Sequence, residues 1–505
     1  MKILLAALNS QYVHSNPAVK YLYTVTADTS DEVTMREFTI NNEYSYIYGE
    51  LVRANCDMVC FSCYIWNIEI IKSIGSDLKK AKPGIKICLG GPEVSFDGHV
   101  FALENDWVDF IISGEGEYSF YRLCQVLRNE ENAQELPLET VPGLIYRKNG
   151  KIYVNQQIEP MDFNSIPFIY SVLECDPKRV IYYESSRGCP FRCSYCMSSI
   201  EKTVRALDTV RVKKELGYFL HKKVMQVKFV DRTFNYDADR ACEIIKYILD
   251  NDNGITNFHF EICADLLNDR MLALFGQARE GLFQLEIGIQ SANPDTLKAV
   301  NRNENVYPVL YNIERLVALG NVHIHVDLIA GLPYETYELF GRSFNKVYAL
   351  KADAFQMGFL KVLKGTVMEQ LSEEYGLEYR DKAPYEFISN YWLSAEEAVR
   401  LKAIEKMLNT YYNRGGFVRT IDYLMSAMAA EPFDFYEKLS GFYYDMGYHN
   451  VNRKKEEQYR ILRKFALTEL GEQSRDDVEK VLIEDFEASF NSEEVKRFLK
   501  KGWEI

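Results

Sequence analysis

The sequence predicts an α/β protein in three parts: an N-terminal doubly wound parallel sheet, a partial barrel of six β/α units, and an α-helical C-terminal region. Apolar runs of strand length alternate with amphipathic, helix-length segments up to residue 372. Polar or glycine-rich loops follow most of these strands, and helical periodicity alone continues from Ser394 onward. We place the three parts at residues 1–130, 179–372 and 373–505, with a connector over 131–178.

The N-terminal part contains five predicted strands, at residues 2–8, 33–40, 58–65, 85–89 and 108–112, and Pro17 is placed to open a helix. Five strands with crossover helices form a flavodoxin-like Rossmannoid domain, whose ligand lies beyond the carboxyl ends of the strands. Glycines there let the backbone approach a flat or phosphorylated ligand closely. The candidate contacts at these ends are Tyr12, Ser62, Tyr64, Gly90, Gly91, Gly114 and Glu115.

The connector contains a predicted β-hairpin, in which residues 144–146 pair with 152–154. The six barrel strands are expected at 180–183, 227–230, 258–261, 283–291, 323–327 and 354–366. Because barrel enzymes keep their chemistry at the carboxyl ends of their strands, polar residues there are site candidates. They are Asp231, Glu261, Gln290, Ser291 and Asp327.

Three cysteines follow the first barrel strand with C-x3-C-x2-C spacing: Cys189, Cys193 and Cys196. Three thiolates on one loop can ligate three irons of a [4Fe–4S] cluster and leave the fourth iron open to a small molecule. A structural zinc site is the alternative, but it needs a distant fourth ligand. Arg187 and Arg192 would partly offset the negative charge of such a cluster.

A second set of cysteines, Cys56, Cys60 and Cys63, has the same spacing. It lies in an apolar run without Gly or Pro, which indicates a buried strand. Side chains of a strand alternate between its two faces, so Cys60 and Cys63 should point in opposite directions. We therefore interpret this set as core packing, because buried cysteines usually behave as small hydrophobes.

The cysteine loop and three later strings resemble radical S-adenosylmethionine (SAM) enzymes. These strings are Glu-Ile-Gly-Ile-Gln-Ser, Asp-Leu-Ile-Ala-Gly-Leu-Pro and Leu-Lys-Gly-Thr. Further upstream, Gly-Gly-Pro-Glu from Gly90 and Ser-Gly-Glu-Gly-Glu from Ser113 resemble the cobalamin-binding domain of the B12-dependent radical SAM class. That class includes the anaerobic bacteriochlorophyll ring cyclase and many C-methyltransferases. The resemblance covers roughly residues 1–370.

This resemblance implies three cofactors: a [4Fe–4S] cluster, SAM and cobalamin. Cys189, Cys193 and Cys196 would be the metal ligands and the catalytic core, and the seven N-terminal strand-end residues would contact cobalamin. The pattern Asp-x-His-x-x-Gly does not follow the first strand, so a histidine lower ligand to cobalt is not assured, although His14 lies in the right loop. On the SAM side, the resemblance implies that Tyr195 contacts the adenine and that Asp231 binds the SAM amino group. Glu261, Gln290 and Ser291 would face the SAM pocket, and Asp327 would reach the ribose hydroxyls or the substrate.

The chemistry implied by the resemblance is reductive cleavage of SAM to a 5′-deoxyadenosyl radical, hydrogen abstraction from an unactivated carbon, and methyl transfer from methylcobalamin. Two alternatives stay open. One is cyclisation or rearrangement without net methylation, and the other is a non-catalytic iron–sulfur or corrinoid-binding protein. The implied partners are a small-molecule or peptide substrate and a one-electron donor of the flavodoxin or ferredoxin type.

Composition limits the remaining possibilities. A net charge of −14 argues against a large nucleic-acid surface, and no apolar stretch reaches the length of a membrane span. The eleven cysteines include clustered, metal-like spacings, which favour a reducing cytoplasm over a disulfide framework. The C-terminal region predicts helices over 394–412, 418–430, 433–446, 454–470 and 476–488, and its role does not follow from the sequence.

Overall fold

The computed structural model describes residues 1–29, 31–128, 137–157, 160–201, 203–302, 305–451 and 453–503. They form two compact units. The first comprises Met1–Gln284, Lys361–Leu371 and Arg380–Glu386, and the second comprises Leu285–Leu360, Ser372–Tyr379 and Phe387–Ile505. The predicted domain boundary between residues 130 and 131 lies outside the described residues, and the other two boundaries stay predictions.

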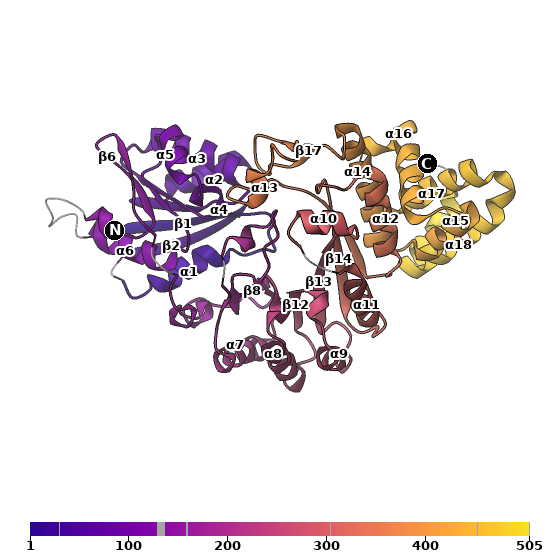
Figure 1. Cartoon of the computed structure of the whole chain (residues 1–505), viewed down its shortest axis with the longest axis horizontal. Coiled ribbons are helices and arrows are strands. Elements are labelled where there is room, and N and C mark those ends of the chain that lie inside the picture. The colour runs from indigo at the N-terminus through magenta and orange to yellow at the C-terminus, as the bar shows by residue number, and fades with distance from the viewer. Residues whose placement is uncertain are drawn as a thin grey trace. The chain divides into compact units, whose positions relative to one another are not determined.

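The first unit begins with a seven-stranded sheet in the order β2-β1-β3-β4-β5-β6-β7 (Figure 1). Its first five strands are parallel, which gives the order 2-1-3-4-5 of flavodoxin-like domains and confirms the predicted fold. These strands are β1 (Lys2–Asn9), β2 (Glu32–Thr39), β3 (Met58–Ser62), β4 (Lys86–Gly90) and β5 (Phe110–Ile112).

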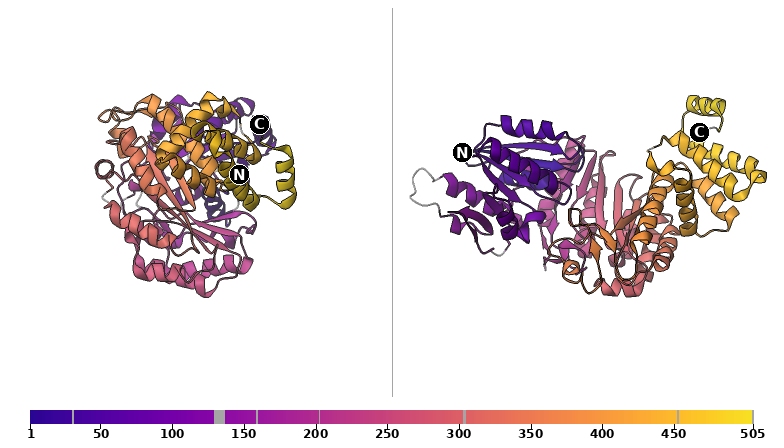
Figure 2. Two further views of the ribbon diagram at one scale, coloured as in Figure 1. Left: turned by 90° about the vertical axis from the view of Figure 1, so that its right-hand side faces the viewer. Right: turned by 90° about the horizontal axis from the view of Figure 1, so that it is seen from above.

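Helices cover both faces of this sheet, and each face has its own apolar core (Figures 1 and 2). Helices α1 (Pro17–Val25) and α6 (Glu117–Arg128) bury Val19 and Phe120 on one face. On the other face lie α2 (Tyr44–Arg53), α3 (Ile68–Ala81), α4 (Pro92–Ser95) and α5 (Gly98–Glu104). Pro17 opens α1 as predicted, and the side chain of Asn16 accepts the Val19 N–H as its N-cap.

The predicted hairpin forms from β6 (Leu144–Lys148) and β7 (Lys151–Val154). The sequence did not indicate that this hairpin extends the first sheet: β6 pairs antiparallel with β5, with Ile111 opposite Ile145. The short strand β5 would otherwise be an open sheet edge, and the hairpin covers it. The connector is thus built into the first sheet.

The second sheet is six-stranded and parallel, in the order β15-β14-β13-β12-β11-β8, as predicted for the partial barrel. Its strands are β8 (Val180–Tyr183), β11 (Gln226–Phe229), β12 (Asn257–Ile262), β13 (Phe283–Gln290), β14 (His323–Ala330) and β15 (Ala354–Phe359). The intervening helices are α7 (Thr209–Lys222), α8 (Ala238–Asp250), α9 (Asp269–Phe275), α10 (Pro294–Ala299), α11 (Val306–Val317) and α12 (Tyr337–Tyr348). Buried and half-buried residues alternate along β13, and along β14 after its exposed first residue, so each strand has one core face and one barrel-interior face.

The C-terminal helices follow the predicted pattern: α14 (Ala395–Leu408), α15 (Val418–Met428), α16 (Pro432–Asp445), α17 (Lys455–Leu470) and α18 (Arg475–Ser489). Ser394 and Glu397 form the capping box expected at the start of α14. One helix was missed, α19 (Ser492–Lys501), although its capping box of Asn491 and Glu494 was readable in the sequence.

The first C-terminal helix does not continue to Tyr412 as an α-helix. It ends at Leu408, and a π-helical turn follows over Asn409–Asn413. Asn413 explains the change, because its amide accepts the N–H of Phe355 and donates to the C=O of Phe355, at 2.9 Å each. The π turn therefore satisfies the backbone of β15, the edge strand of the second sheet.

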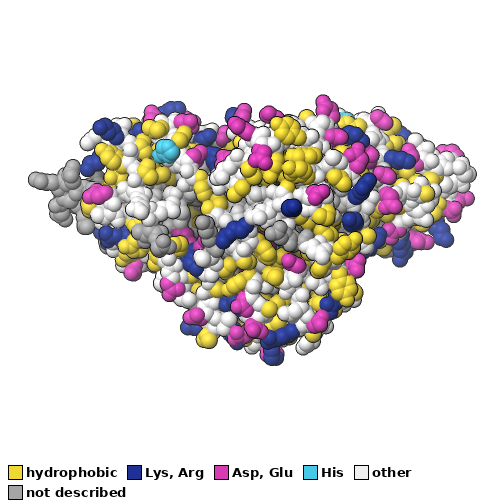
Figure 3. Space-filling view, viewed as in Figure 1, with side chains coloured by type: hydrophobic (Ala, Val, Ile, Leu, Met, Phe, Trp, Pro, Cys, Tyr) yellow, Lys and Arg dark blue, Asp and Glu magenta, His cyan; other side chains and the backbone are white. Residues whose placement is uncertain are grey.

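Charges of both signs are interspersed on the face of the molecule seen in Figure 3, among the residues drawn in colour. Within the described part of the chain, no helix has the length and hydropathy needed to cross a bilayer. All eleven cysteines are free thiols.

Candidate functional site

The cysteine loop follows β8 and the short strand β9 (Ser186–Arg187), which pairs antiparallel with β10 (Arg205–Ala206). Cys189 and Cys193 are each 8% exposed, and Cys196 is half-buried. The Cys196 N–H donates to the Cys193 C=O at 3.1 Å, which folds the last two cysteines into a tight turn. The loop thus brings all three cysteines into one short segment beside the end of β8.

Gly188 is needed for this course of the chain. Its φ is +90°, and a Cβ there would lie 2.1 Å from the Thr203 carbonyl oxygen. An L-residue would be strained by the dihedral angle and would collide with backbone. The close approach presses the start of the cysteine loop against the segment that leads into β10.

The donor set fits an iron–sulfur cluster better than a single metal ion. Among the residues that the structure describes, no group of three or more His, Cys, Asp or Glu side chains is arranged to hold one metal ion, so the zinc alternative has no ligand set there. A cubane takes one thiolate for each iron, so its ligands need not converge on one point. Cys189 Sγ lies 3.5 Å from Thr233 Oγ1, a hydrogen bond of the kind that tunes cluster sulfurs.

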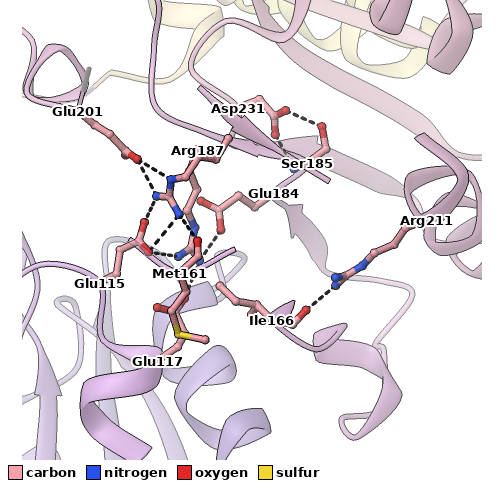
Figure 4. Close-up of polar contacts among 11 residues, drawn as sticks. Glu115, Glu117, Met161, Ile166, Glu184, Ser185, Arg187, Glu201, Arg211 and Asp231 are labelled. Atoms are coloured by element: carbon pink, nitrogen blue, oxygen red, sulfur yellow. Dashed lines mark hydrogen bonds and ion pairs between the residues drawn. The ribbon is translucent and has the colours of Figure 1, made fainter. Parts of the chain in front are cut away.

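Asp231 holds the chain just before the loop. Its carboxylate accepts hydrogen bonds from the Ser185 N–H at 2.7 Å and from the Ser185 hydroxyl at 2.6 Å (Figure 4). It also accepts one from the Ser186 hydroxyl at 2.6 Å. Asp231 is 1% exposed, and this burial raises its pKa against the lowering effect of the hydrogen bonds. The predicted contact with the SAM amino group stays a prediction, while the geometry gives Asp231 a direct role in holding the cysteine loop.

The remaining SAM-side candidates lie on several strands. Tyr195 sits within the cysteine loop and Glu261 is half-buried near the end of β12. Asp327 does not lie at a strand end as expected, because β14 continues three residues further to Ala330. His325 Nε2 lies 3.3 Å from Asp327 Oδ1, on the same face of the strand.

Gln290 and Ser291 lie together where β13 ends. Gln290 has a φ of +71°, and its amide folds back over Gly288, where a Cβ would lie 1.9 Å from Gln290 Nε2. Ser291 is fully buried and donates to Glu335 Oε1 at 2.6 Å. Burial raises the pKa of Glu335 to about 7 despite this bond and a second one from Ser343. Ser291 therefore points into a buried hydrogen-bonded cluster of the second unit.

A cavity of about 690 Å³ lies within the first unit. Its walls come from the strand-end loops of the first sheet and from the region around the cysteine loop. Six of the seven predicted cobalamin contacts line it: Ser62, Tyr64, Gly90, Gly91, Gly114 and Glu115. Tyr12 is not among the lining residues; it is 80% exposed and stacks under Arg179, 5.6 Å from ring centroid to guanidinium carbon.

The cavity wall suits a flat ligand. Tyr64 and Trp66 stack in parallel, with ring centroids 4.4 Å apart and planes 5° apart. Gly91 has a φ of +112°, and a Cβ there would lie 2.5 Å from the Cys63 carbonyl oxygen, so this part of the wall is bare backbone. A cavity of this volume lies in the range of cofactor sites. The residues present thus fit a planar macrocycle such as a corrin.

Among the cavity-lining residues that sequence reasoning missed are Tyr182 and Arg232. Tyr182 was detectable, because it lies near the carboxyl end of β8, where barrel enzymes keep their chemistry. The Tyr182 hydroxyl lies 2.6 Å from His14 Nδ1. Burial lowers the pKa of His14, and the positive charges of Lys228 and Arg179 lower it further, so the imidazole is neutral near pH 7 with one ring nitrogen bonded to Tyr182.

The cysteines at Cys56, Cys60 and Cys63 behave as predicted. Cys60 packs in the core on one face of the first sheet and Cys63 in the core on the other. Burial raises the pKa of both thiols, which keeps them protonated. This geometry assigns them to packing.

Three family models match the chain. Residues 3–123 match the B12 binding domain, residues 183–347 match the radical SAM superfamily, and residues 373–504 match a family described as "Protein of unknown function (DUF4080)". The first match covers the five parallel strands of the first sheet, and the second covers the partial barrel from the end of β8 to α12 without β15. The third covers the C-terminal helices.

Two curated relatives share these parts. The cobalamin-dependent radical SAM methyltransferase TokK of Streptomyces tokunonensis is 24% identical over 355 residues, which are 65% of this chain and 50% of TokK. The anaerobic magnesium-protoporphyrin IX monomethyl ester cyclase of Rubrivivax gelatinosus is 24% identical over 280 residues, 52% of this chain and 48% of the cyclase. The chain thus spans about half the length of these curated relatives.

A solved structure shares the fold more extensively. The cobalamin-dependent S-adenosylmethionine radical enzyme OxsB, with aqua-cobalamin and S-adenosylmethionine bound, aligns with 99% of this chain and 80% of its own, with a TM-score of 0.63 and 16% identity. A [4Fe–4S] cluster, SAM and cobalamin are typical of proteins with this pair of domains. The chain thus combines a domain that matches the B12 binding domain with a domain that matches the radical SAM superfamily.

Proposed function

We propose that the protein is a cobalamin-dependent radical SAM methyltransferase that methylates an unactivated carbon of a small molecule or peptide. One observation supports this most: a single cavity borders both the predicted cobalamin contacts and the cysteine loop. Gly91 and Glu115 line it from the first sheet, and Gly188 and Met197 line it from the cysteine loop. A ligand bound at the first sheet and a molecule bound beside the cluster would therefore lie in the same cavity.

When bound, the cluster supplies the electron that cleaves SAM, and cobalamin carries the methyl group to be transferred. The chain's own residues bind and orient these groups. Cys189, Cys193 and Cys196 would hold three irons, and Asp231 keeps the preceding backbone in place through three hydrogen bonds. The Tyr64–Trp66 stack provides a flat apolar surface that excludes water from one side of the cavity.

The electron must come from outside the chain, because radical SAM enzymes need a reductant. We propose a one-electron donor of the flavodoxin or ferredoxin type. Tyr195 would contact the SAM adenine, and Glu261 would face the SAM pocket from β12.

Similarity to the methyltransferase TokK, over 65% of this chain, supports the proposal. Similarity to the magnesium-protoporphyrin cyclase supports a second candidate, a cyclisation or rearrangement without net methylation. The two candidate functions differ in how they use SAM. Methyl loading of cobalamin releases S-adenosylhomocysteine, whereas radical generation releases 5′-deoxyadenosine.

The test uses the full chain, purified without oxygen and loaded with cluster and cobalamin. SAM and a reductant are added, and both SAM-derived products are quantified. The proposal predicts 5′-deoxyadenosine together with S-adenosylhomocysteine, and no S-adenosylhomocysteine when cobalamin is omitted. Deoxyadenosine alone, with cobalamin present, would favour the second candidate. If neither 5′-deoxyadenosine nor S-adenosylhomocysteine formed, both candidate functions would be contradicted.

A further inference from the structure

Six charged side chains form a network at the wall of the cavity: Arg187, Arg205, Glu115, Glu117, Glu184 and Glu201 (Figure 4). Glu115 comes from the loop after β5, and Glu117 is the first residue of α6; both lie in the B12-binding domain. The two arginines come from β9 and β10, the paired strands on either side of the cysteine loop in the sequence. The network therefore joins two segments that lie 70 to 90 residues apart in the sequence.

Arg187 is the more buried of the two arginines, with 11% of its side chain exposed. One of its Nη atoms donates to Glu117 Oε1 at 2.5 Å and to Glu184 Oε2 at 2.9 Å, and the other lies 3.4 Å from Glu115 Oε2. Its guanidinium also stacks over the Phe163 ring, 4.7 Å from the centroid. Charge-assisted bonds in such a buried setting fix the geometry strongly. This arginine therefore neutralises protein carboxylates, and the expected offset of cluster charge is not its main role.

Glu115 bridges the two arginines. It accepts hydrogen bonds from both Nη atoms of Arg205, and it also pairs with Arg187. Arg205 is held in turn by Glu201, at 2.6 Å and 3.0 Å, and by the Met161 C=O at 3.0 Å. Loss of the Glu115 charge would leave the two guanidinium groups facing each other without a carboxylate between them.

The arginines are directly opposite each other in the β9–β10 pair, so the network holds both strands at one point. Cys189 follows Arg187 by two residues, and Gly188 between them is pressed against the Thr203 carbonyl. A shift of Arg187 must therefore move the first cysteine. The position of the cysteine loop depends on the network through this short, crowded backbone.

The other side of the network borders the cavity. Gly114, Glu115, Gly116 and Glu117 all line it, and Gly114 has a φ of +82°. A ligand seated against this loop would restrict the backbone that carries Glu115. The same four residues would then respond to the ligand and hold the arginines of the cysteine loop.

We propose that Glu115 is a positioning residue that couples cobalamin binding to the order of the cysteine loop. The inference rests on the proposed function in one respect, namely that cobalamin is the ligand of this cavity. Coupling between two sites is reciprocal, so the cluster tightens cobalamin binding by the same factor by which cobalamin stabilises the cluster.

The test measures the dissociation constant of hydroxocobalamin for the full chain, with the cluster reconstituted and with the cluster removed, under anaerobic conditions. In the wild-type protein we expect binding at least about 5-fold tighter with the cluster present. In Glu115→Gln the ratio should fall to about one, because the amide cannot bridge two guanidinium groups as a carboxylate does. The ratio of the dissociation constants without and with the cluster measures the coupling alone. Loss of a direct contact between Glu115 and cobalamin would weaken binding equally with and without the cluster, and would leave this ratio unchanged.

Glu201→Gln is the matched control. Glu201 also lines the cavity and also pairs with Arg205, but it lies only four residues from Arg205 on the same segment. This variant should keep the wild-type ratio. As a second readout, saturating cobalamin should slow the loss of iron to a chelator in the wild-type protein and in Glu201→Gln, and not in Glu115→Gln.

A wild-type ratio of one, or an unchanged ratio in Glu115→Gln, would overturn the coupling while leaving the proposed function intact. Failure of the wild-type protein to bind cobalamin in either cluster state would overturn the proposed function and this inference with it.

Discussion

Two regions of this molecule have the same cysteine spacing, but the cysteines of one pack in apolar cores and those of the other lie on a loop suited to cluster ligation. Cys56, Cys60 and Cys63 run along β3 and the residues on either side of it, and strand geometry sends Cys60 and Cys63 into two separate cores. Cys189, Cys193 and Cys196 occupy a loop bounded by Gly188, with a tight turn between the last two. The difference teaches that backbone conformation, and not spacing, decides whether three thiols can act as a ligand set.

The largest expected effect separates the two sets directly. Cys193→Ala removes one of three cluster ligands, so we expect loss of the iron–sulfur absorption band and of nearly all bound iron. Cys63→Ala should retain the wild-type iron content. Iron analysis and visible spectra of both variants, reconstituted in parallel, measure this. Retention of the full band by Cys193→Ala, or its loss in Cys63→Ala, would contradict the assignment of the cluster to the loop cysteines and of packing to the strand cysteines.

Removal of the cluster should expose the difference in a second way. After chelation of the iron, we expect alkylation of Cys196 first, because it is the least buried of the three loop cysteines. Cys60 and Cys63 are 5% and 0% exposed, and burial raises the pKa of both thiols, so they should react only when the domain unfolds. Mass spectrometry of a timed alkylation series assigns each site. Early modification of Cys63 would contradict the buried strand.

A smaller effect concerns the glycine that bounds the cysteine loop. Gly188→Ala adds a methyl group 2.1 Å from the Thr203 carbonyl at a φ of +90°, and should cost about 1–3 kcal/mol together with part of the bound iron. Gly150→Ala is the control, because its φ of +75° is similar but nothing lies within 4 Å of the added atom. Thermal melts and iron analysis compare the two. Equal iron contents would show that the close approach does not shape the loop.

The smallest effect tests the packing role of the strand set. Cys63→Ser puts a hydroxyl into an apolar core, and we expect a loss of about 1–3 kcal/mol in the free energy of unfolding with the cluster unchanged. Denaturant unfolding of the cluster-free proteins measures it. A fully stable variant would mean that Cys63 does not pack as tightly as its burial indicates.

The same distinction explains how much could be predicted from the sequence. Periodicity and loop chemistry identified both sheets, because four strand-end loops and six β/α units leave strong local signals. The pairing of β6 with β5 could not be predicted, since it depends on which edge of the sheet is open. The strand limit near Asp327 and the π turn at Asn409–Asn413 likewise depend on long-range backbone hydrogen bonds.

The candidate site was predictable where the residues are consecutive and less so where they only meet in space. Six strand-end residues predicted as one cluster do line one cavity, and Tyr12 does not. The bridge from Glu115 to Arg187 and Arg205 was not predicted, although all three residues were visible in the sequence. Charge pairs between distant segments leave no periodic signal, so only the structure identifies them.

The measurement that tests the account most directly is the cobalamin and iron content of the full chain, purified without oxygen from cobalamin-fed cells. The account predicts about one cobalamin and about four irons per chain, with a broad iron–sulfur band beside the corrinoid spectrum. A full cluster without cobalamin, even after reconstitution with hydroxocobalamin, would contradict the claim that the cavity of the first unit is built for a second cofactor.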